Sequence, residues 1–180
     1  MKTFKITSMM LLFVAALFSM PTMAQNETTP TLTDPEIASV AVTANQIDVD
    51  YGKIALKKSK DAEIRKFAQT MVDDHTSVIN QAVTLAKKLG VTPKDNAVSK
   101  SLMEGAKKTK MTLNSKEGKA FDEAYIDNEV SYHEAVISTV KNVLIPQTQN
   151  AELKDLLQSV VPVFEHHLEM AKTAQANHKR

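Results

Sequence analysis

Residues 61–90 read DAEIRKFAQTMVDDHTSVINQAVTLAKKLG, and this stretch carries a complete helix signal. Its apolar residues recur every three or four positions, which is the period of one face of an α-helix. Asp61 can cap the first turn, Gly90 can end the helix, and Pro93 follows just beyond. The stripe consists of Ile64, Phe67, Ala68, Met71, His75, Val78, Ile79, Ala82, Ala86 and Leu89.

The same period recurs on both sides of this stretch. Before it, Thr33 and Asp34 followed by Pro35 form an N-cap with proline at the first helical position. Because only a few residues separate the first two helices, we expect them to pack antiparallel. Pro162 lies inside the last apolar pattern and should kink that helix. The patterns predict further helices over about 34–60, 96–111, 119–144 (ending before Pro146) and 150–176.

These helices predict an all-α protein. The segment between residues 91 and 118 is long and Lys-rich, and its short helix has a weak apolar face. It is therefore expected to cross over on the surface of the bundle. The chain is predicted to form a ferritin-like four-helix bundle with a long crossover containing a short extra helix. Residues 34–177 would form this single domain. A simple up-down bundle with three short loops is the alternative.

The N-terminus has the features of an export signal. Lys2 and Lys5 precede an apolar run over residues 9–18, and small residues surround Ala24. The run is too short to cross a bilayer, which needs about 20 apolar residues. We expect a signal peptide over residues 1–24, cleavage after Ala24, and a flexible leader over 25–33. The mature chain then has no transmembrane segment, and the periplasm is the favoured location.

Composition excludes several classes of function. The chain has no cysteine, which excludes disulfides, a Cys-based metal site and a lipid-anchored lipoprotein. Loss of Lys2 and Lys5 with the signal changes the formal net charge from +1 to −1. A near-neutral chain lacks the basic face that nucleic-acid binding requires. The sequence also lacks a nucleophile elbow, a phosphate-binding glycine loop and a nucleotide fingerprint, so hydrolytic chemistry is not indicated.

Three histidines mark the candidate site. His75, His133 and His167 fall on three different predicted helices, and each lies on the apolar face. At about 1.5 Å rise per residue, each lies roughly 20–25 Å along a helix of roughly 40 Å. Mid-length side chains meet whichever way the helices run. Because a buried polar group is costly without a partner, a shared metal ion is one solution.

Acidic residues accompany these histidines on the inward faces. Asp48 projects inward from the first helix, and Glu129 lies four residues before His133 on one side of its helix. Asp74 lies at the edge of its stripe, where it could orient a ligand histidine. Tyr125 is a further hydrogen-bond partner, and Asp122, about two turns from Glu129, is assigned a structural role or a second site.

The predicted metal ligands are therefore His75, His133, His167, Glu129 and Asp48. Imidazole and carboxylate together suit one transition-metal ion, with Fe, Zn, Cu, Mn and Ni as candidates. The preferred hypothesis is metal sequestration or stress protection. A metal-free structural or interaction module of the cell envelope is the alternative, and a metal-dependent redox enzyme comes third. A homo-oligomer remains open, and no protein partner is identified.

Three phrases resemble the domain-of-unknown-function 4142 family. They are FAQTMVDDHT (67–76), FDEAYI (121–126) with His133, and His167 followed by Leu168. The resemblance covers about residues 35–174 and implies a secreted bacterial protein with a ferritin-like four-helix bundle. Ferritin-like di-iron proteins use Glu-x-x-His motifs, whereas Val72 and Phe164 stand three residues before His75 and His167. The set has too few carboxylates for a di-iron oxidase, which favours a single ion or no metal.

Overall fold

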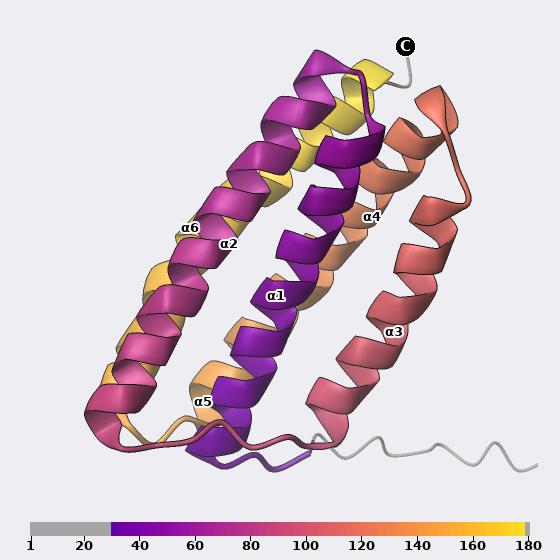
Figure 1. Ribbon diagram of the computed structural model, residues 1–180. Helices are drawn as coiled ribbons and strands as arrows, with labels where there is room; N and C mark the ends of the chain where they lie inside the picture. Colours follow the sequence, from indigo (N-terminus) through magenta and orange to yellow (C-terminus); the bar gives the residue numbers. More distant parts are fainter. Residues whose placement is uncertain (1–29, 179–180) are drawn as a thin grey trace, which may run out of the picture.

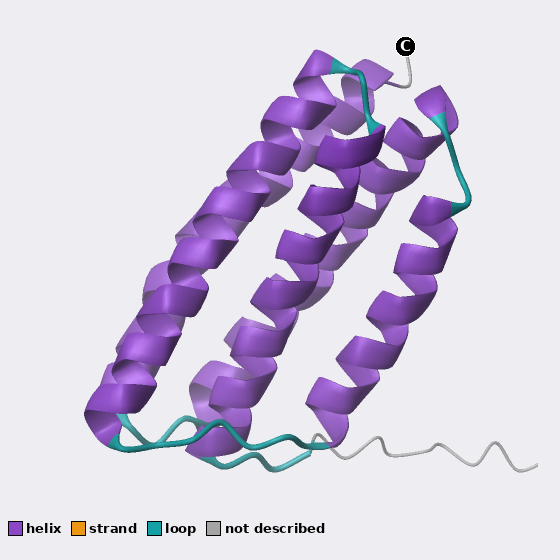
Figure 2. Cartoon of the chain, in the orientation of Figure 1, coloured by secondary structure: helices purple, strands orange, loops and turns teal. Residues whose placement is uncertain are grey.

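The computed structural model describes residues 30–178 and shows an all-α protein, with no strand in that part of the chain (Figure 2). The predicted signal peptide and residues 25–29 of the predicted leader lie outside the described residues. No helix within the described range is long and apolar enough to span a membrane. The elements are α1 (Asp34–Lys58), α2 (Ala62–Leu89), α3 (Ala97–Asn114), α4 (Gly118–Thr139), the π-helical turn η1 (Val140–Leu144), α5 (Ile145–Gln147) and α6 (Ala151–His178).

The chain follows a bundle path with one long crossover (Figure 1). Helices α1 and α2 form an antiparallel hairpin, and α3 then runs back along the length of the bundle beside α1. Helix α4 therefore starts at the opposite end and runs parallel to α2, and α6 returns antiparallel to α4. This order confirms the predicted long crossover and contradicts the alternative of a simple up-down bundle. The crossover helix is 18 residues long and ends at Asn114, three residues later than predicted.

The ends of the first two helices form as their sequences predict. Thr33 and Glu36 make a reciprocal capping box at the start of α1, with the Thr33 N–H donating to Glu36 Oε2 at 3.0 Å. Asp61 Oδ1 accepts from the Ile64 N–H at 3.0 Å at the start of α2. Gly90 ends α2 with φ at 64°, a left-handed conformation that glycine adopts without a steric penalty.

The predicted end of the 119–144 helix before Pro146 is wrong. The helical path continues from α4 through η1 into α5 and ends at Gln147. A proline in an α-helix lacks an N–H and its ring clashes with the carbonyl four residues earlier, here that of Asn142. The wider π-helical turn lies over that carbonyl and accommodates the proline ring. Helix α6 likewise continues through Pro162.

Buried side chains divide into apolar clusters at different heights. One cluster at the α1–α2 link end includes Tyr51, Phe67 and Phe121. Another at the opposite end includes Val40 and Leu157. Leu32 from the predicted leader belongs to that second cluster, and its N–H donates to Gln147 Oε1 at 2.7 Å. The end of the predicted leader thus lies against the bundle.

Candidate metal centre

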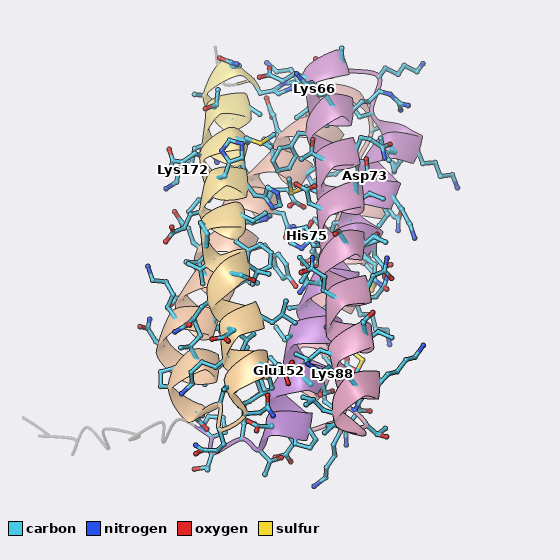
Figure 3. The ribbon with its side chains drawn as sticks, turned by 90° about the vertical axis from the view of Figure 1, so that its left-hand side faces the viewer. Lys66, Asp73, His75, Lys88, Glu152 and Lys172 are labelled. Carbon is cyan, nitrogen blue, oxygen red and sulfur yellow. The ribbon has the colours of Figure 1, made fainter. Side chains whose placement is uncertain are left out.

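A layer of buried polar side chains lies between the apolar clusters. Figure 3 shows His75 at mid-height on α2, between the ends of the bundle. On α2, α4 and α6, a polar residue of this layer lies between residues of one apolar cluster and residues of another. The layer contains the five predicted ligands, each at most 3% exposed: Asp48 from α1, His75 from α2, Glu129 and His133 from α4, and His167 from α6.

The five side chains form two overlapping groups. One nitrogen from each of His75, His133 and His167 lies within 4.8 Å of the others. Ligand atoms of Asp48, Glu129 and His133 lie equally close together, so His133 belongs to both groups. Asp48 Oδ2 lies 3.3 Å from His75 Nε2 and 3.6 Å from His133 Nε2. Asp48 therefore joins the histidines of α2 and α4 from the facing helix.

Each histidine donates one ring N–H to the protein. Asn45 Nδ2 donates to the Ala41 carbonyl, which fixes the orientation of the amide. Asn45 Oδ1 therefore faces His75 Nδ1 at 2.7 Å and accepts a hydrogen bond from its N–H. His133 Nδ1 donates to the Glu129 carbonyl at 3.0 Å. His167 Nε2 donates to Asp74 Oδ2 at 2.9 Å.

The opposite nitrogen of each ring is left with a free lone pair. His75 Nε2, His133 Nε2 and His167 Nδ1 are buried and have no hydrogen-bond partner among the described residues. Metal-binding histidines have this arrangement, because a partner for one nitrogen fixes the tautomer that presents the other nitrogen to the ion.

The carboxyl groups of the layer are also buried. Neither oxygen of Asp48 or of Glu129 has a hydrogen-bond partner outside this pair in the described part of the chain, and the two acids can hydrogen-bond each other once one is protonated. Burial raises the pKa of Asp48 to about 8. Burial, together with the charge of Asp48, raises the pKa of Glu129 well above its usual value. Without a cation, burial therefore favours the protonated form of both acids.

The histidines are neutral under the same conditions. Burial lowers the pKa of His133 to about 4 and also lowers the pKa of His167. Burial and the two neighbouring histidines place the pKa of His75 well below its usual value. Neutral imidazole is the form that binds metal. The histidines therefore need no deprotonation at neutral pH before they can coordinate an ion.

Two of the separations between donor atoms suit a four-coordinate ion. Metal–nitrogen and metal–oxygen bonds of about 2.0–2.1 Å in a tetrahedron put ligand atoms about 3.3–3.4 Å apart. The two separations from Asp48 Oδ2, 3.3 Å to His75 and 3.6 Å to His133, are close to that value. Glu129 Oε2 lies 3.6 Å from His133 Nδ1, the nitrogen that already donates to a carbonyl. Glu129 therefore faces the occupied nitrogen of His133, while it also lies close to Asp48.

The supporting residues take different positions. Asp74 lies at the surface end of His167, with its side chain 47% exposed. Tyr125 is fully buried and its hydroxyl has no partner among the described residues, while the charges of Glu129 and Asp48 help to raise its pKa. Asp122 is buried, but the structure does not bring it into either group.

Sequence reasoning missed two neighbours of His75. Asn45 supplies its hydrogen-bond acceptor, and the Phe164 ring stacks on its imidazole with centroids 5.1 Å apart. Asn45 lies three residues before Asp48 and therefore on the same face of α1, a signal that could have identified it. Phe164 carries no such signal, because an aromatic residue in an apolar stripe is indistinguishable from ordinary core.

Comparisons with known proteins identify the family and agree with the fold. A family model described as "Domain of unknown function (DUF4142)" matches residues 19–174. The chain therefore belongs to this family, which confirms the resemblance in its sequence. A comparison with curated proteins gives no match. Among solved structures, the chain is similar to "CopM in the Cu(II)-bound form", with 18% identity and a TM-score of 0.62 over 81% of this chain and 98% of that one. At this identity the likeness shows a shared helical fold.

Proposed function

We propose that this member of the DUF4142 family binds one transition-metal ion between His75, His133, His167 and Asp48. The observation that carries the proposal is the set of three free imidazole nitrogens, each on a ring whose other nitrogen is already held by the protein. The physiological role we infer is sequestration of the ion or protection against metal stress.

A metal-free hydrogen-bond network explains the layer less well. In such a network the buried polar atoms would satisfy one another, because an unsatisfied buried group is destabilising by about 1–3 kcal/mol. Asp48 and Glu129 can hydrogen-bond each other once one of them is protonated, but three ring nitrogens of the layer have no hydrogen-bond partner in the described structure. A cation would provide a partner for these three nitrogens and for Asp48 in one position.

Charge also supports a divalent ion. Asp48 and Glu129 carry two negative charges when both are ionised, and the histidines are neutral. A divalent cation would make the buried layer neutral overall, which removes the large penalty for an isolated buried charge. Under this proposal Asp48 coordinates the ion, and Glu129 balances the remaining charge from beside it.

Cu(II) is the first ion to test. Sites rich in imidazole suit Cu, Zn, Ni and Fe, and among divalent ions of the first row Cu(II) forms the most stable complexes. The structural relative named above is CopM in its Cu(II)-bound form. The Cu(II) bound in that relative supports the choice of ion for this chain, since the two chains share their helical fold.

Storage fits the geometry better than catalysis. Four protein ligands would complete a tetrahedral ion, whereas catalytic sites keep one position open for water or substrate. The five polar side chains are each at most 3% exposed, and apolar clusters lie above and below them. We therefore propose a binding protein and keep a redox enzyme as the third hypothesis, after a metal-free module of the cell envelope.

We further propose that residues 1–24 direct export to the periplasm and are removed after Ala24. The basic start, the short apolar run and the small residues before Ala24 support this location. Mass spectrometry of the protein recovered from the periplasmic fraction should give an N-terminus at Gln25.

Metal analysis of the purified, tag-free protein tests the proposal. The protein is stripped with a chelator, exposed separately to Cu(II), Zn(II), Ni(II), Mn(II) and Fe(II), and freed of loose ions. We expect about one ion per chain and no binding by the variant His75→Ala/His133→Ala. The matched control is His166→Ala, because His166 is exposed and adjacent to His167. Failure of every ion to bind the folded protein would overturn the proposal.

A further inference from the structure

An elongated apolar cavity lies directly beside the polar layer, and neither the family nor the proposed metal site accounts for it. Its volume is about 240 Å³. Its lining on α2 extends from Val78 to Leu89, a length of about 16 Å at 1.5 Å per residue. Asn45 and Phe164, the two neighbours of His75, close the end that faces the polar layer.

A void of this size is unusual in a native core. Protein interiors are close-packed and hold few voids larger than a water molecule. An engineered apolar cavity of ~150 Å³ stays free of water and binds benzene. The cavity in this protein is larger, and its walls are mostly Val, Leu, Ile and Ala side chains. Such walls offer water few partners, which leaves an apolar molecule as the fitting occupant.

A π-helical turn and a helical turn that contains proline both border the cavity. Val140 and Leu144, the first and last residues of the π-helical turn η1, both line it. On α6, Val160 and Phe164 line it on either side of Pro162, which removes one helical hydrogen bond. Irregular helical turns are frequent at functional sites. The π-helical turn and the turn that contains Pro162 therefore border the same space.

The cavity and a groove on the protein surface meet at the contact between α2 and α6. The shallow groove runs along the outside of this contact, and Leu85 and Leu156 line both the groove and the cavity. At the rim of the groove Lys88 forms an ion pair with Glu152 across this contact (Figure 3).

The lining chemistry indicates what the occupant is. Among the described residues that line the cavity, Asp34 alone is charged, and its two oxygens accept from the N–H groups of Gln149 and Asn150. Within the described range, no lysine, arginine or histidine lines the cavity to pair with an anionic head group. From this and from the length of the lining along α2, we propose that the cavity binds a single uncharged, unbranched hydrocarbon chain.

Titration of the metal-free protein with the n-alkanols from butanol to octanol tests the proposal. Each added methylene buries further apolar surface, so affinity in calorimetry should rise about fourfold per methylene. The thermal midpoint should rise with it, because the ligand binds the folded state. The matching n-alkanoates should bind at least tenfold more weakly, since nothing basic faces the cavity. No detectable binding of any alkanol, or equal binding of octanoate and octanol, would overturn the proposal.

Filling the cavity provides the matched variant. Ala82→Leu, on the cavity wall, should abolish alkanol binding, and Ala86→Leu serves the same purpose if the first variant does not fold. Ala62→Leu is the control, because Ala62 is an exposed alanine at the start of the same helix. Unchanged octanol affinity in a folded, cavity-filled variant would show that the alkanols bind elsewhere and would contradict the proposal. This test uses no metal, so its outcome is independent of the metal site.

Discussion

Asn45 Oδ1 lies 2.7 Å from His75 Nδ1, and this contact sets which nitrogen His75 presents to the centre of the bundle. The Asn45 amide nitrogen is itself committed to the Ala41 carbonyl at 2.8 Å. The proton of His75 therefore sits on Nδ1, and Nε2 faces Asp48. One amide on α1 thus orients a histidine of α2 toward an acid of α1.

Asn45→Ala should weaken metal binding without removing a ligand. Loss of a residue that orients a metal-binding histidine typically lowers affinity by about 10–100-fold. The metal-free protein should also lose about 1–3 kcal/mol of stability, because the His75 N–H becomes an unsatisfied buried donor. Competition titration and urea unfolding measure the two effects. Gln46→Ala is the control, since Gln46 is exposed on the same helix; equal effects of both variants would contradict the role of Asn45.

Asp74→Leu should lower metal affinity by about 10–100-fold, because His167 would lose the carboxylate that holds its Nε2 proton. Asp74→Asn should lose less, since the amide oxygen can still accept that hydrogen bond. The neighbouring Asp73 is exposed and bonded to Gln69, so Asp73→Leu should leave affinity unchanged. Identical metal affinities for Asp74→Leu and the unmodified protein would show that Asp74 has no role in metal binding.

The metal-free protein should become less stable as pH rises from 6.5 to about 8. Burial raises the pKa of Asp48 from 3.8 to about 8. The contribution of protonated Asp48 to the free energy of unfolding is therefore fully present below pH 3.8 and is lost as pH rises to the pKa of the folded protein, about 8. The histidine pKa values are lowered, so their opposing effect is confined to pH below 6.5. The decline should be at most about 1.4 kcal/mol per pH unit for each buried acid.

Urea unfolding across this pH range measures that decline, and Asp48→Asn should make it shallower because asparagine does not titrate. The same slope in both proteins would show that Asp48 has its ordinary pKa in the folded state.

Metal binding should release protons at neutral pH. Asp48 and Glu129 are protonated in the metal-free layer because burial raises the pKa of both, and a divalent cation would favour their ionised forms. We expect up to two protons per ion, measured by calorimetry in buffers of different ionisation enthalpy. Glu129→Gln should reduce the number by one while retaining binding. An unchanged number in this variant would contradict the proposed charge balance.

Gly52 is required where α1 meets α2. A Cβ atom added there would lie 3.0 Å from the backbone oxygen of Ala68 and 2.8 Å from Val72 Cγ2. Gly52→Ala should therefore destabilise the protein by about 1–3 kcal/mol through overpacking, despite the higher helix propensity of alanine. Gly105→Ala on α3 meets nothing within 4 Å and should stabilise by about 0.5–1 kcal/mol. Urea unfolding of both variants checks the opposite signs.

The sequence by itself determined the helices and the inward faces on which the polar residues lie. Periodicity and caps are local properties, so the stripe of residues 61–90, the Asp61 cap and the Gly90 stop could be read directly. The positions of Asp48, His75, Glu129, His133 and His167 on buried faces followed from the same period. Mid-length placement then brought these residues to one height without knowledge of the helix directions.

Only the tertiary structure decided what each of these side chains touches. The hydrogen bond from His75 to Asn45 depends on how α1 and α2 are rotated and shifted against each other, which no single-helix pattern encodes. The continuation through Pro146 depends on a π-helical turn that propensity rules do not anticipate. The apolar cavity, lined mainly by α1, α2, α4, η1 and α6, is likewise a property of packing, because a void is set by the side chains of several helices at once.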